Sequence, residues 1–377
     1  MARRVLLVAG EASGDLHGSG VVRELRERAP GIELYGIGGE NMLREGMELV
    51  FHIRDLSFMG LAEVIRNLVT VKRVENTMRL LLEQRRPDVV VLIDYPGFNL
   101  RFAKTAKRVG IPVLYYISPQ VWAWHKSRVK TMRKVVDRMK VVFPFEVDIY
   151  REAGVDVEFV GHPVAERIGA RRDRATFFRD HGLIPGQPLL GLLPGSRLQE
   201  LERILPVMAQ AARRLQQNPG VQVALGVASN LGPEVVRRYL PEDWSPVLVE
   251  QGTYDLMCHA DVALVTSGTA TLETGWFGTP MVVVYRTSAL TYVAGRLLVD
   301  VPYIALANIV AGKRVVPELI QRQLTADSLT AEARRLFTDT VYAADMREQL
   351  SVIRRRLGEP GASARVARAV LELGKAA

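Results

Sequence analysis

The chain contains a single cysteine, Cys258, in 377 residues. One cysteine permits no intrachain disulfide and no cysteine-rich metal site, which is typical of proteins from a reducing compartment. The six histidines show no HxxxH spacing, so we expect no bound metal. Long apolar runs are also missing, because the N-terminal run ends at Ala9 and polar residues interrupt the region 289–311. We therefore expect a cytoplasmic protein whose membrane association, if it has any, is peripheral.

Composition indicates a globular protein with an excess of positive charge. Hydrophobic residues make up 48% of the chain and the formal net charge is +9. Part of this excess lies in HKSRVKTMRKVVDRMK at 125–140, where seven Lys and Arg accompany one Asp. Such a run favours phosphate-bearing partners such as an anionic membrane surface, and the alternative is a solvated helix face. No nucleic-acid-binding module is recognisable, so we expect no nucleic acid partner.

Short apolar runs alternate with helical patterns along the whole chain. This alternation predicts parallel sheets with helices on both faces. The pattern pauses after the Gly161-His162-Pro163 segment and restarts with LLGLLPGSR at 189–197. We therefore predict an α/β protein of two doubly wound, Rossmann-like domains that face a cleft. The expected domains are 1–163 with the C-terminal helices 343–377, and 164–342; the expected strands include 34–37, 89–93, 113–117, 140–143, 158–160, 221–225, 246–249, 262–265 and 281–285.

Each half opens with a strand that runs into a loop of small residues. These openings are VLLVAGEASGDLHG and LLGLLPGSRLQEL. Neither contains GxGxxG or GxxxxGK[ST], which disfavours a dehydrogenase or a P-loop ATPase. Since ligands of open α/β sheets bind at the carboxyl ends of the strands, we expect a donor side and an acceptor side of the cleft.

The segment DVALVTSGTATLE at 261–273 predicts a nucleotide diphosphate site. Ser267, Gly268 and Thr269 place small hydroxyls and flexible backbone at the start of a helix, whose N–H groups favour phosphate. Glu273 lies one residue too far along for a capping box with Thr269 as N-cap, and would suit a pair of ribose hydroxyls. The alternative is an ordinary strand-to-helix turn.

Three further residues are candidates for the same nucleotide. Arg197, with Ser196 before it in LPGSR, can place a cation beside a diphosphate leaving group, so that no metal would be needed. An exposed turn arginine is the alternative. Asn308 lies in the apolar stretch PYIALANIVAG, where an unpartnered amide would be costly.

Asp94 is the candidate general base. It ends the apolar run VVVLI and begins the loop DYPGFN, at the carboxyl end of a predicted strand. A turn-forming Asp before Pro96-Gly97 is the alternative. His17 in GDLHG competes for the role, because imidazole titrates near neutral pH.

Two segments point to a lipid partner. Leu61, Ile65 and Leu68 fall on one face of a predicted helix, and Trp122 and Trp124 stand beside the basic run. Aromatic side chains next to cations suit a membrane interface or acyl chains. Packing into the protein core is the alternative for both segments.

Eight blocks spread over both halves together resemble lipid-A-disaccharide synthase, a glycosyltransferase family of the GT-B fold. The blocks are GEASGDLHG, FMGLAEV, DYPGFN, SPQVWAWHKSRV, VGHP, LPGSR, SGTATLE and ALANIVAG. The resemblance implies inverting transfer of 2,3-diacylglucosamine from its UDP derivative to the 6-hydroxyl of 2,3-diacylglucosamine 1-phosphate, in lipid A biosynthesis. The products would be a β-1,6 disaccharide 1-phosphate and UDP, without a cofactor, at the inner face of the inner membrane.

The resemblance also assigns roles to residues. It places Asp94 at the essential acidic position, where Gly97 replaces a second acidic residue that the family often has. It places Arg197, Glu273 and Asn308 on donor-side motifs, and Ser13 and Gly14, with His17 nearby, on the N-terminal loop. A UDP-sugar 2-epimerase and a UDP-sugar-binding regulatory protein are the competing interpretations. The sequence leaves a homodimer open.

Overall fold

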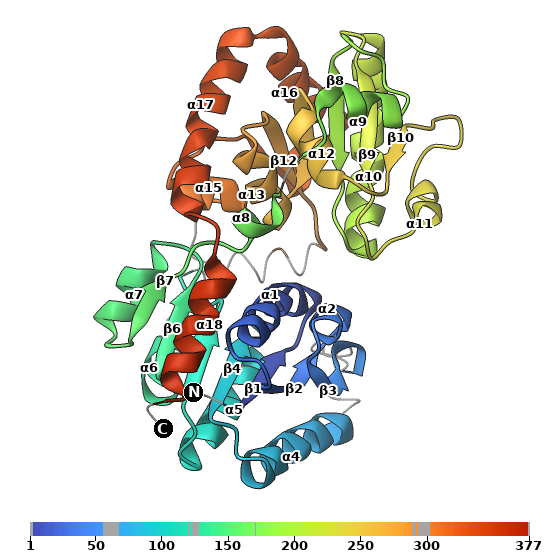
Figure 1. The fold of residues 1–377 in the computed structure, drawn as a ribbon. Coiled ribbons are helices and arrows are strands. Elements are labelled where there is room, and N and C mark those ends of the chain that lie inside the picture. Colours follow the sequence, from blue (N-terminus) through green and yellow to red (C-terminus); the bar gives the residue numbers. More distant parts are fainter. Residues whose placement is uncertain are drawn as a thin grey trace. The chain divides into compact units, whose positions relative to one another are not determined.

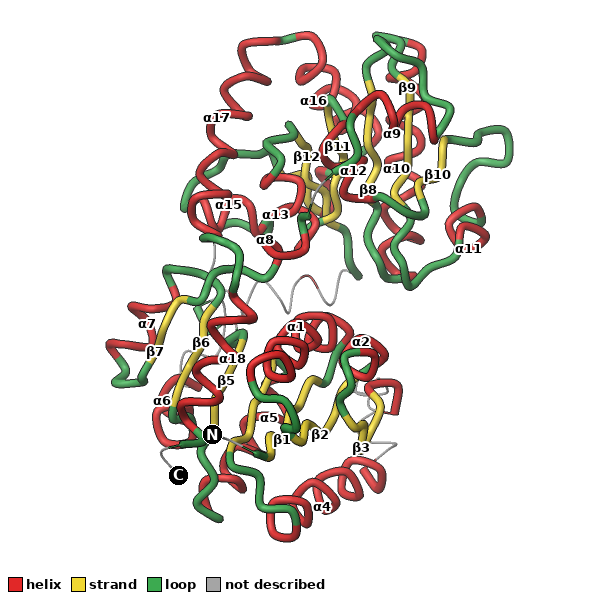
Figure 2. Tube along the Cα trace, viewed as in Figure 1, coloured by secondary structure: helices red, strands yellow, loops and turns green. Residues whose placement is uncertain are grey.

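The computed structural model describes residues 3–55, 68–119, 121–122, 128–169, 171–288, 292 and 302–375. The chain forms two compact units: unit 1 is Met1–Glu166 with Leu357–Ala377, and unit 2 is Arg167–Arg356 (Figure 1). In each unit the strands form a central layer with helices packed outside it (Figure 2). None of the helices that the structure describes is long and apolar enough to cross a membrane.

Unit 1 contains a seven-stranded parallel sheet of order β3-β2-β1-β4-β5-β6-β7. Its strands are β1 Arg4–Ala9, β2 Glu33–Gly38, β3 Glu48–His52, β4 Val89–Ile93, β5 Val113–Tyr116, β6 Arg138–Val141 and β7 Val157–Phe159. Its helices are α1 Ala12–Arg28, α2 Glu40–Arg44, α4 Leu68–Gln84, α5 Pro96–Arg108, α6 Arg128–Val135, α7 Glu146–Glu152 and α18 Ala362–Leu373, with α8 Val164–Arg167 at the boundary.

Unit 2 contains a six-stranded parallel sheet of order β10-β9-β8-β11-β12-β13. Its strands are β8 Leu189–Leu193, β9 Gln222–Gly226, β10 Val247–Val249, β11 Val262–Thr266, β12 Met281–Tyr285 and β13 Glu318–Ile320. Its helices are α9 Arg174–Asp180, α10 Leu198–Gln217, α11 Pro233–Arg237, α12 Thr253–His259, α13 Thr269–Trp276, α15 Leu306–Ala311, α16 Ala326–Thr338 and α17 Thr340–Leu357.

The central strands are continuous apolar runs. Every residue of β4, β8 and β11 is buried. A parallel sheet covered by helices on both faces buries both sides of a strand, so alternation with polar residues disappears. This explains why these strands were easy to predict from apolar runs alone.

The strand order reverses once in each sheet. In unit 1 the reversal lies between β1 and β4, where Ala9 pairs with Ile93. In unit 2 it lies between β8 and β11, where Leu193 pairs with Val265. Loops that leave two such neighbouring strands diverge to opposite faces and open a crevice where ligands of α/β proteins bind. The loops at these two positions carry Asp94 in unit 1 and Arg197 and Ser267 in unit 2.

The second boundary between the units differs from the expected one at residue 343. Helix α17 belongs to unit 2, because Met281 N donates to the Met346 sulfur at 3.4 Å and Arg356 Nη1 donates to Val310 O at 2.7 Å. Only the last helix, α18, returns to unit 1, where it packs beside α1 (Figure 1). The helical tail therefore divides between the two units.

The sixth strand is also shifted from its predicted position at 140–143. It spans Arg138–Val141, and Phe143 begins a turn in which its N–H donates to Glu146 Oε2 at 3.2 Å. The apolar residues that follow Val141 therefore belong to a loop.

Asp15, in the first turn of α1, binds this helix to the start of α2. Its carboxylate is 2% exposed. Oδ1 accepts from Gly39 N at 2.6 Å and Met42 N at 3.0 Å, and Oδ2 accepts from Asn41 N at 3.1 Å and Asn41 Nδ2 at 2.8 Å. These bonds satisfy the first N–H groups of α2, which would otherwise be unpaired.

We predict that Asp15→Ala lowers the free energy of unfolding by about 2–4 kcal/mol, because buried donors lose their acceptor. Urea unfolding followed by circular dichroism measures this change. Asp148→Ala is the control, since that side chain is 77% exposed and pairs with Arg151 at 3.5 Å; it should cost less than about 0.5 kcal/mol. Equal losses in the two variants would contradict the fastening role.

Candidate functional site

Asp94 occupies a strained turn at the end of β4. Asp94 and Tyr95 both have φ 47°, in the left-handed region. Asp94 N donates to Tyr116 O at 3.0 Å, while Asp94 O accepts from Tyr115 Oη at 2.6 Å and from Asn99 Nδ2 at 2.7 Å. Neighbouring elements thus hold the backbone in a conformation that it would otherwise avoid, as is frequent at functional sites.

The carboxyl group of Asp94 is suited to accept a proton. Burial, and secondly the nearby carboxylate of Glu11, raise the pKa of Asp94 to about 6. No side chain in the described part of the chain donates a hydrogen bond to this carboxyl group. A carboxylate with a pKa closer to neutral is a stronger base than an ordinary aspartate and stays largely ionised at pH 7.5.

The N-terminal loop lies beside this turn. A Cβ on Gly10 would lie 2.1 Å from the Tyr95 ring, so only glycine permits the observed packing. Ser13 is exposed and Gly14 is buried, where a Cβ on Gly14 would lie 3.3 Å from Ala9 Cβ of β1. The prediction that Ser13 and Gly14 belong to a loop is wrong, because α1 begins at Ala12 and both residues lie in its first turn. Their contact with a substrate stays a prediction.

His17 and Trp122 lie at the two ends of a series of ring contacts, which we call the aromatic row. Its five members are Trp122, Phe145, Phe143, His162 and His17. Successive ring centres lie 5.4, 5.4, 5.1 and 6.5 Å apart. The row places His17 against His162, and its role as an alternative base stays a prediction. Phe143 and Phe145 were missed, because FPF after an apolar run reads as more strand.

The other residues predicted to contact lipid lie outside the described part of the chain. This applies to Leu61, Ile65 and Trp124. Leu68 begins α4, but its side chain is also outside the description. Farther along α4, Val74, Met78 and Leu82 are buried in the core of unit 1. That part of the helix therefore packs against the sheet.

The Ser-Gly-Thr loop of unit 2 leads into α13 as predicted. Gly268 is the N-cap residue, with φ 151°, and Thr269 is the first residue of the helix. Ser267 Oγ donates to Ile304 O at 2.9 Å. A Cβ on Gly268 would meet nothing within 4 Å, so the approach to the helix N-terminus is open. The first-turn N–H groups can therefore receive an anion.

Glu273 lies in the second turn of α13 and is 8% exposed. Tyr254 Oη donates to its Oε1 at 2.7 Å, and Arg167 Nη2 lies 3.7 Å from the same oxygen. Burial, and secondly the Glu273 charge, raise the pKa of Tyr254, which keeps its hydroxyl a donor. One carboxylate oxygen is thus held by the protein, which leaves Oε2 for a ligand. Tyr254 was missed because it comes from a different helix, α12.

Arg197 is the N-cap residue of α10, and its side chain is 78% exposed. The Glu200 carboxylate already accepts from Ser196 N at 3.0 Å and from Arg197 N at 3.2 Å. Asn230 Nδ2 donates to Ser196 O at 2.9 Å. The backbone groups of this loop are therefore hydrogen-bonded within the protein. The exposed guanidinium of Arg197 is the group that the loop can present to a diphosphate. Of the two helix N-termini, α13 is the open one.

Asn308 is completely buried, and its carboxamide is fully used. Oδ1 accepts from Val315 N at 2.7 Å and Val316 N at 2.9 Å; Nδ2 donates to Val316 O at 3.0 Å and Glu318 Oε1 at 2.8 Å. Glu318 in turn accepts from Ile304 N and Ala305 N, each at 3.0 Å. Both N–H groups of the Asn308 carboxamide are therefore already bound to the protein, so none is left to donate to a nucleotide as expected. Asn308 instead fixes the segment that Ser267 contacts.

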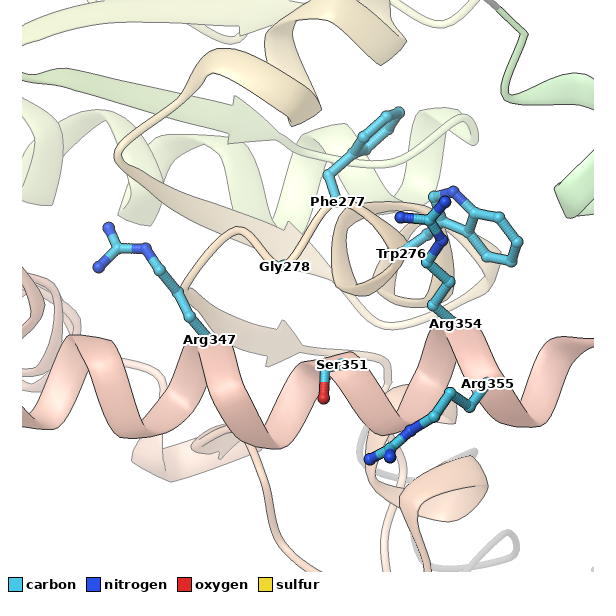
Figure 3. Close-up of a pocket in the computed structure, with 7 residues that line it drawn as sticks. All are labelled: Trp276, Phe277, Gly278, Arg347, Ser351, Arg354 and Arg355. Carbon is cyan, nitrogen blue, oxygen red and sulfur yellow. The ribbon is translucent and has the colours of Figure 1, made fainter.

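A cavity of about 520 Å³ lies in unit 2 where α17 passes the end of α13 (Figure 3). Its lining residues are Trp276, Phe277, Gly278, Arg347, Ser351, Arg354 and Arg355. Arg354 lies over the Trp276 ring at 5.5 Å, whereas Arg347 and Arg355 point in other directions. The cavity is at the opposite end of α13 from Gly268, so it is not the predicted nucleotide site.

Within the described ranges, no group of three or more His, Cys, Asp or Glu side chains could hold a metal ion. The expectation that the reaction needs no metal stays a prediction.

Comparison with known proteins identifies close relatives. The family model for lipid-A-disaccharide synthetase matches residues 5–369. Lipid-A-disaccharide synthase of Syntrophus aciditrophicus is 46% identical over 381 residues, covering 99% of this chain and 98% of the relative. The enzyme of Myxococcus xanthus is 44% identical over 373 residues, covering 98% and 97%.

Solved structures with the same fold are more distant. The glycosyltransferase of kitacinnamycin superposes with a TM-score of 0.67 at 17% identity, covering 99% of each chain. A putative UDP-N-acetylglucosamine 2-epimerase from Listeria monocytogenes has a TM-score of 0.68 at 13% identity, covering 100% of this chain and 98% of the other. The predicted GT-B fold is confirmed, and at these identities the likeness concerns the fold alone.

We predict that Asp94→Asn stabilises the folded protein in a pH-dependent way. The folded-state pKa of Asp94, about 6, exceeds the ordinary value of 3.8. The stability that the aspartate contributes is thus complete below about pH 4 and is lost as pH rises through about 6, a loss that the neutral amide escapes. The variant should unfold like the wild type at pH 4 and be about 2 kcal/mol more stable at pH 7.5.

Urea unfolding at several pH values measures this difference. Asp148→Asn, on the exposed surface of α7, is the control and should show no such trend. A difference for Asp94→Asn that does not change between pH 4 and 7.5 would show that the folded-state pKa is ordinary.

Proposed function

Because the chain belongs to the lipid-A-disaccharide synthase family, we propose that it transfers 2,3-diacylglucosamine from its UDP derivative to the 6-hydroxyl of 2,3-diacylglucosamine 1-phosphate. The products are the β-1,6 disaccharide 1-phosphate and UDP. The structural observation that carries the proposal is the Asp94 turn, in which a carboxyl group with a raised pKa stands at the ligand edge of a doubly wound sheet.

The acceptor's hydroxyl loses its proton to Asp94 in unit 1. As the proton leaves, the acceptor O6 forms a bond to the anomeric carbon, the bond from that carbon to the diphosphate oxygen breaks, and the configuration inverts. Proton transfer to a positioned base contributes about 10²–10⁴-fold to such rates. The pinned backbone at Asp94 keeps the carboxylate in place, because its N–H and its carbonyl are both bound to the protein.

Unit 2 holds the donor through its nucleotide. The diphosphate lies at the open N-terminus of α13, beside Ser267, Gly268 and Thr269, and Glu273 Oε2 accepts from the ribose hydroxyls. As UDP leaves, its growing negative charge is stabilised by the helix N–H groups and by the Arg197 guanidinium. These groups supply positive charge without a metal ion, and we propose that the reaction is independent of one.

A peripheral position at the inner face of the inner membrane suits these lipid substrates. The basic run agrees in part with a solvated helix face, because α6 exposes Lys130, Arg133 and Lys134 and buries Val129 and Met132. Exposed cations of α6 would attract anionic lipid headgroups, at roughly 1 kcal/mol for each cation near the surface. This supports membrane association at this side of unit 1.

The proposal is tested by mixing the two diacylated substrates with the protein and separating the products by thin-layer chromatography. We expect the disaccharide and UDP in equal amounts, with activity unchanged by EDTA. The 2-epimerase interpretation predicts conversion of a UDP-sugar without an acceptor, and the regulatory interpretation predicts UDP binding without a product. Either result would overturn the synthase assignment.

We predict that Asp94→Asn lowers kcat by about 10²–10⁴-fold while the dissociation constant of UDP changes less than about twofold, because the base acts only on the acceptor. A variant that keeps more than about a tenth of wild-type activity would show that Asp94 is not the base.

The pH profile provides a second check on the same residue. Activity should fall below about pH 6, where Asp94 becomes protonated. Glu11→Gln should move this limb to lower pH, because one of the charges that raise the pKa of Asp94 is removed.

We predict that Tyr254→Phe weakens UDP binding about 5–15-fold and leaves kcat nearly unchanged, because Glu273 loses the hydroxyl that fixes Oε1. Isothermal titration with UDP measures the change. The control is Tyr239→Phe, a partly exposed tyrosine of the same unit. If Tyr254→Phe binds UDP as tightly as the wild type does, Tyr254 takes no part in nucleotide binding.

A further inference from the structure

The segment that follows β5 leaves its strand through a strained residue. Ile117 has φ 61°, which is a true outlier for a β-branched side chain. The described residues beyond it are Ser118, Pro119, Val121 and Trp122, and Trp122 is the first ring of the aromatic row. Local preference would not produce this path, so other contacts must hold it.

A buried carboxyl group makes several of those contacts, beside the hydrogen bond from Ile117 N to Lys140 O at 3.0 Å. Glu146, the first residue of α7, is 1% exposed. Its Oε1 accepts from Ser118 Oγ at 2.6 Å and from Trp122 Nε1 at 3.3 Å, while its Oε2 accepts from Phe143 N at 3.2 Å. One side chain thus ties the segment after β5 to the turn after β6.

The chemistry of this arrangement requires an acceptor at position 146. An apolar side chain there would leave the Ser118 hydroxyl, the Trp122 indole N–H and the Phe143 N–H without a partner in a buried place. The carboxyl group itself is costly to bury: desolvation raises the pKa of Glu146 to about 7, against the opposing effect of its hydrogen bonds. Stability alone would favour a different core, which points to a role for the segment that Glu146 holds.

The aromatic row joins that segment to helix α1, which carries His17. Trp122 follows β5, Phe143 and Phe145 follow β6, His162 follows β7, and His17 follows β1. All five therefore lie at the carboxyl edge of the sheet, where ligands of this fold bind. Trp122, Phe145 and His17 stay partly exposed, while Phe143 and His162 are buried and support them. The row is thus an aromatic wall in which two buried rings support three partly exposed ones.

We propose that Glu146 is a positioning residue for the acceptor: by fixing Ser118 and Trp122 it assembles the aromatic row as a wall for the acyl chains of the lipid acceptor. This inference rests on the proposed function, since an acyl-bearing acceptor is part of it. Glu146 does not touch the substrate. It acts through Trp122, whose ring would otherwise leave Phe145.

Kinetics with Glu146→Ala test the role. We expect the KM for the diacylglucosamine 1-phosphate acceptor to rise about tenfold, with the KM for the UDP-linked donor unchanged within about twofold. Glu146→Gln keeps an acceptor oxygen for Ser118 and Trp122 and should restore the acceptor KM to within about threefold of the wild type. The matched control is Glu152→Ala, an exposed carboxylate on the same helix. An equal rise of both KM values, or no rescue by glutamine, would overturn the proposal.

A fluorescence measurement tests the positioning without activity. In a protein whose only tryptophan is Trp122, made with Trp124→Phe, Trp244→Phe and Trp276→Phe, Glu146→Ala should increase acrylamide quenching about threefold, and Glu146→Gln should not. Unchanged quenching in Glu146→Ala would overturn the positioning role, even if the acceptor KM rises. If the wild type makes no disaccharide, the proposed function fails, while this measurement still decides whether Glu146 holds Trp122.

Discussion

Parallel pairing with one reversal of strand order is the constraint on which the candidate site residues of each unit depend. It forces loops from distant parts of the sequence to leave the sheet at one edge, so that the glycine loop after β1 meets Asp94 after β4. The same reversal brings the LPGSR loop after β8 beside the Ser-Gly-Thr loop after β11. Neither pair of loops is close in sequence. The crevice at such a reversal follows from the backbone topology and does not depend on which side chains line it.

Buried acceptors then decide what each loop can do. Asp15 satisfies the start of α2, Glu200 satisfies the LPGSR backbone, and Glu318 with Asn308 satisfies the segment before α15. Each removes backbone N–H groups from the set available to a ligand. Within the described ranges, no side chain supplies such an acceptor at the start of α13. The polar groups left for substrates are thus those that the protein does not use to hold its own loops.

Much of the architecture could be predicted, because central parallel strands are uninterrupted apolar runs. Runs at strand ends are ambiguous, and the sixth strand was shifted because Phe143 belongs to a turn closed by Glu146. Helix α17 was assigned to the wrong side of the boundary, since periodicity shows an apolar face but not the partner that covers it. For the same reason Tyr254 and Glu146 were missed, and Asn308 was taken for a ligand instead of a residue that holds its own loop. Local sequence patterns do not show which residues, distant along the chain, contact each other in the fold.

The absence of a side chain at Gly10 has a consequence for how this protein can vary. A Cβ at that position would meet the Tyr95 ring at 2.1 Å, and Tyr95 is the second left-handed residue of the turn that carries Asp94. A side chain at residue 10 would therefore require a smaller residue at 95. The end of the first strand and the turn after the fourth are thus sterically coupled, although about eighty residues of chain lie between them.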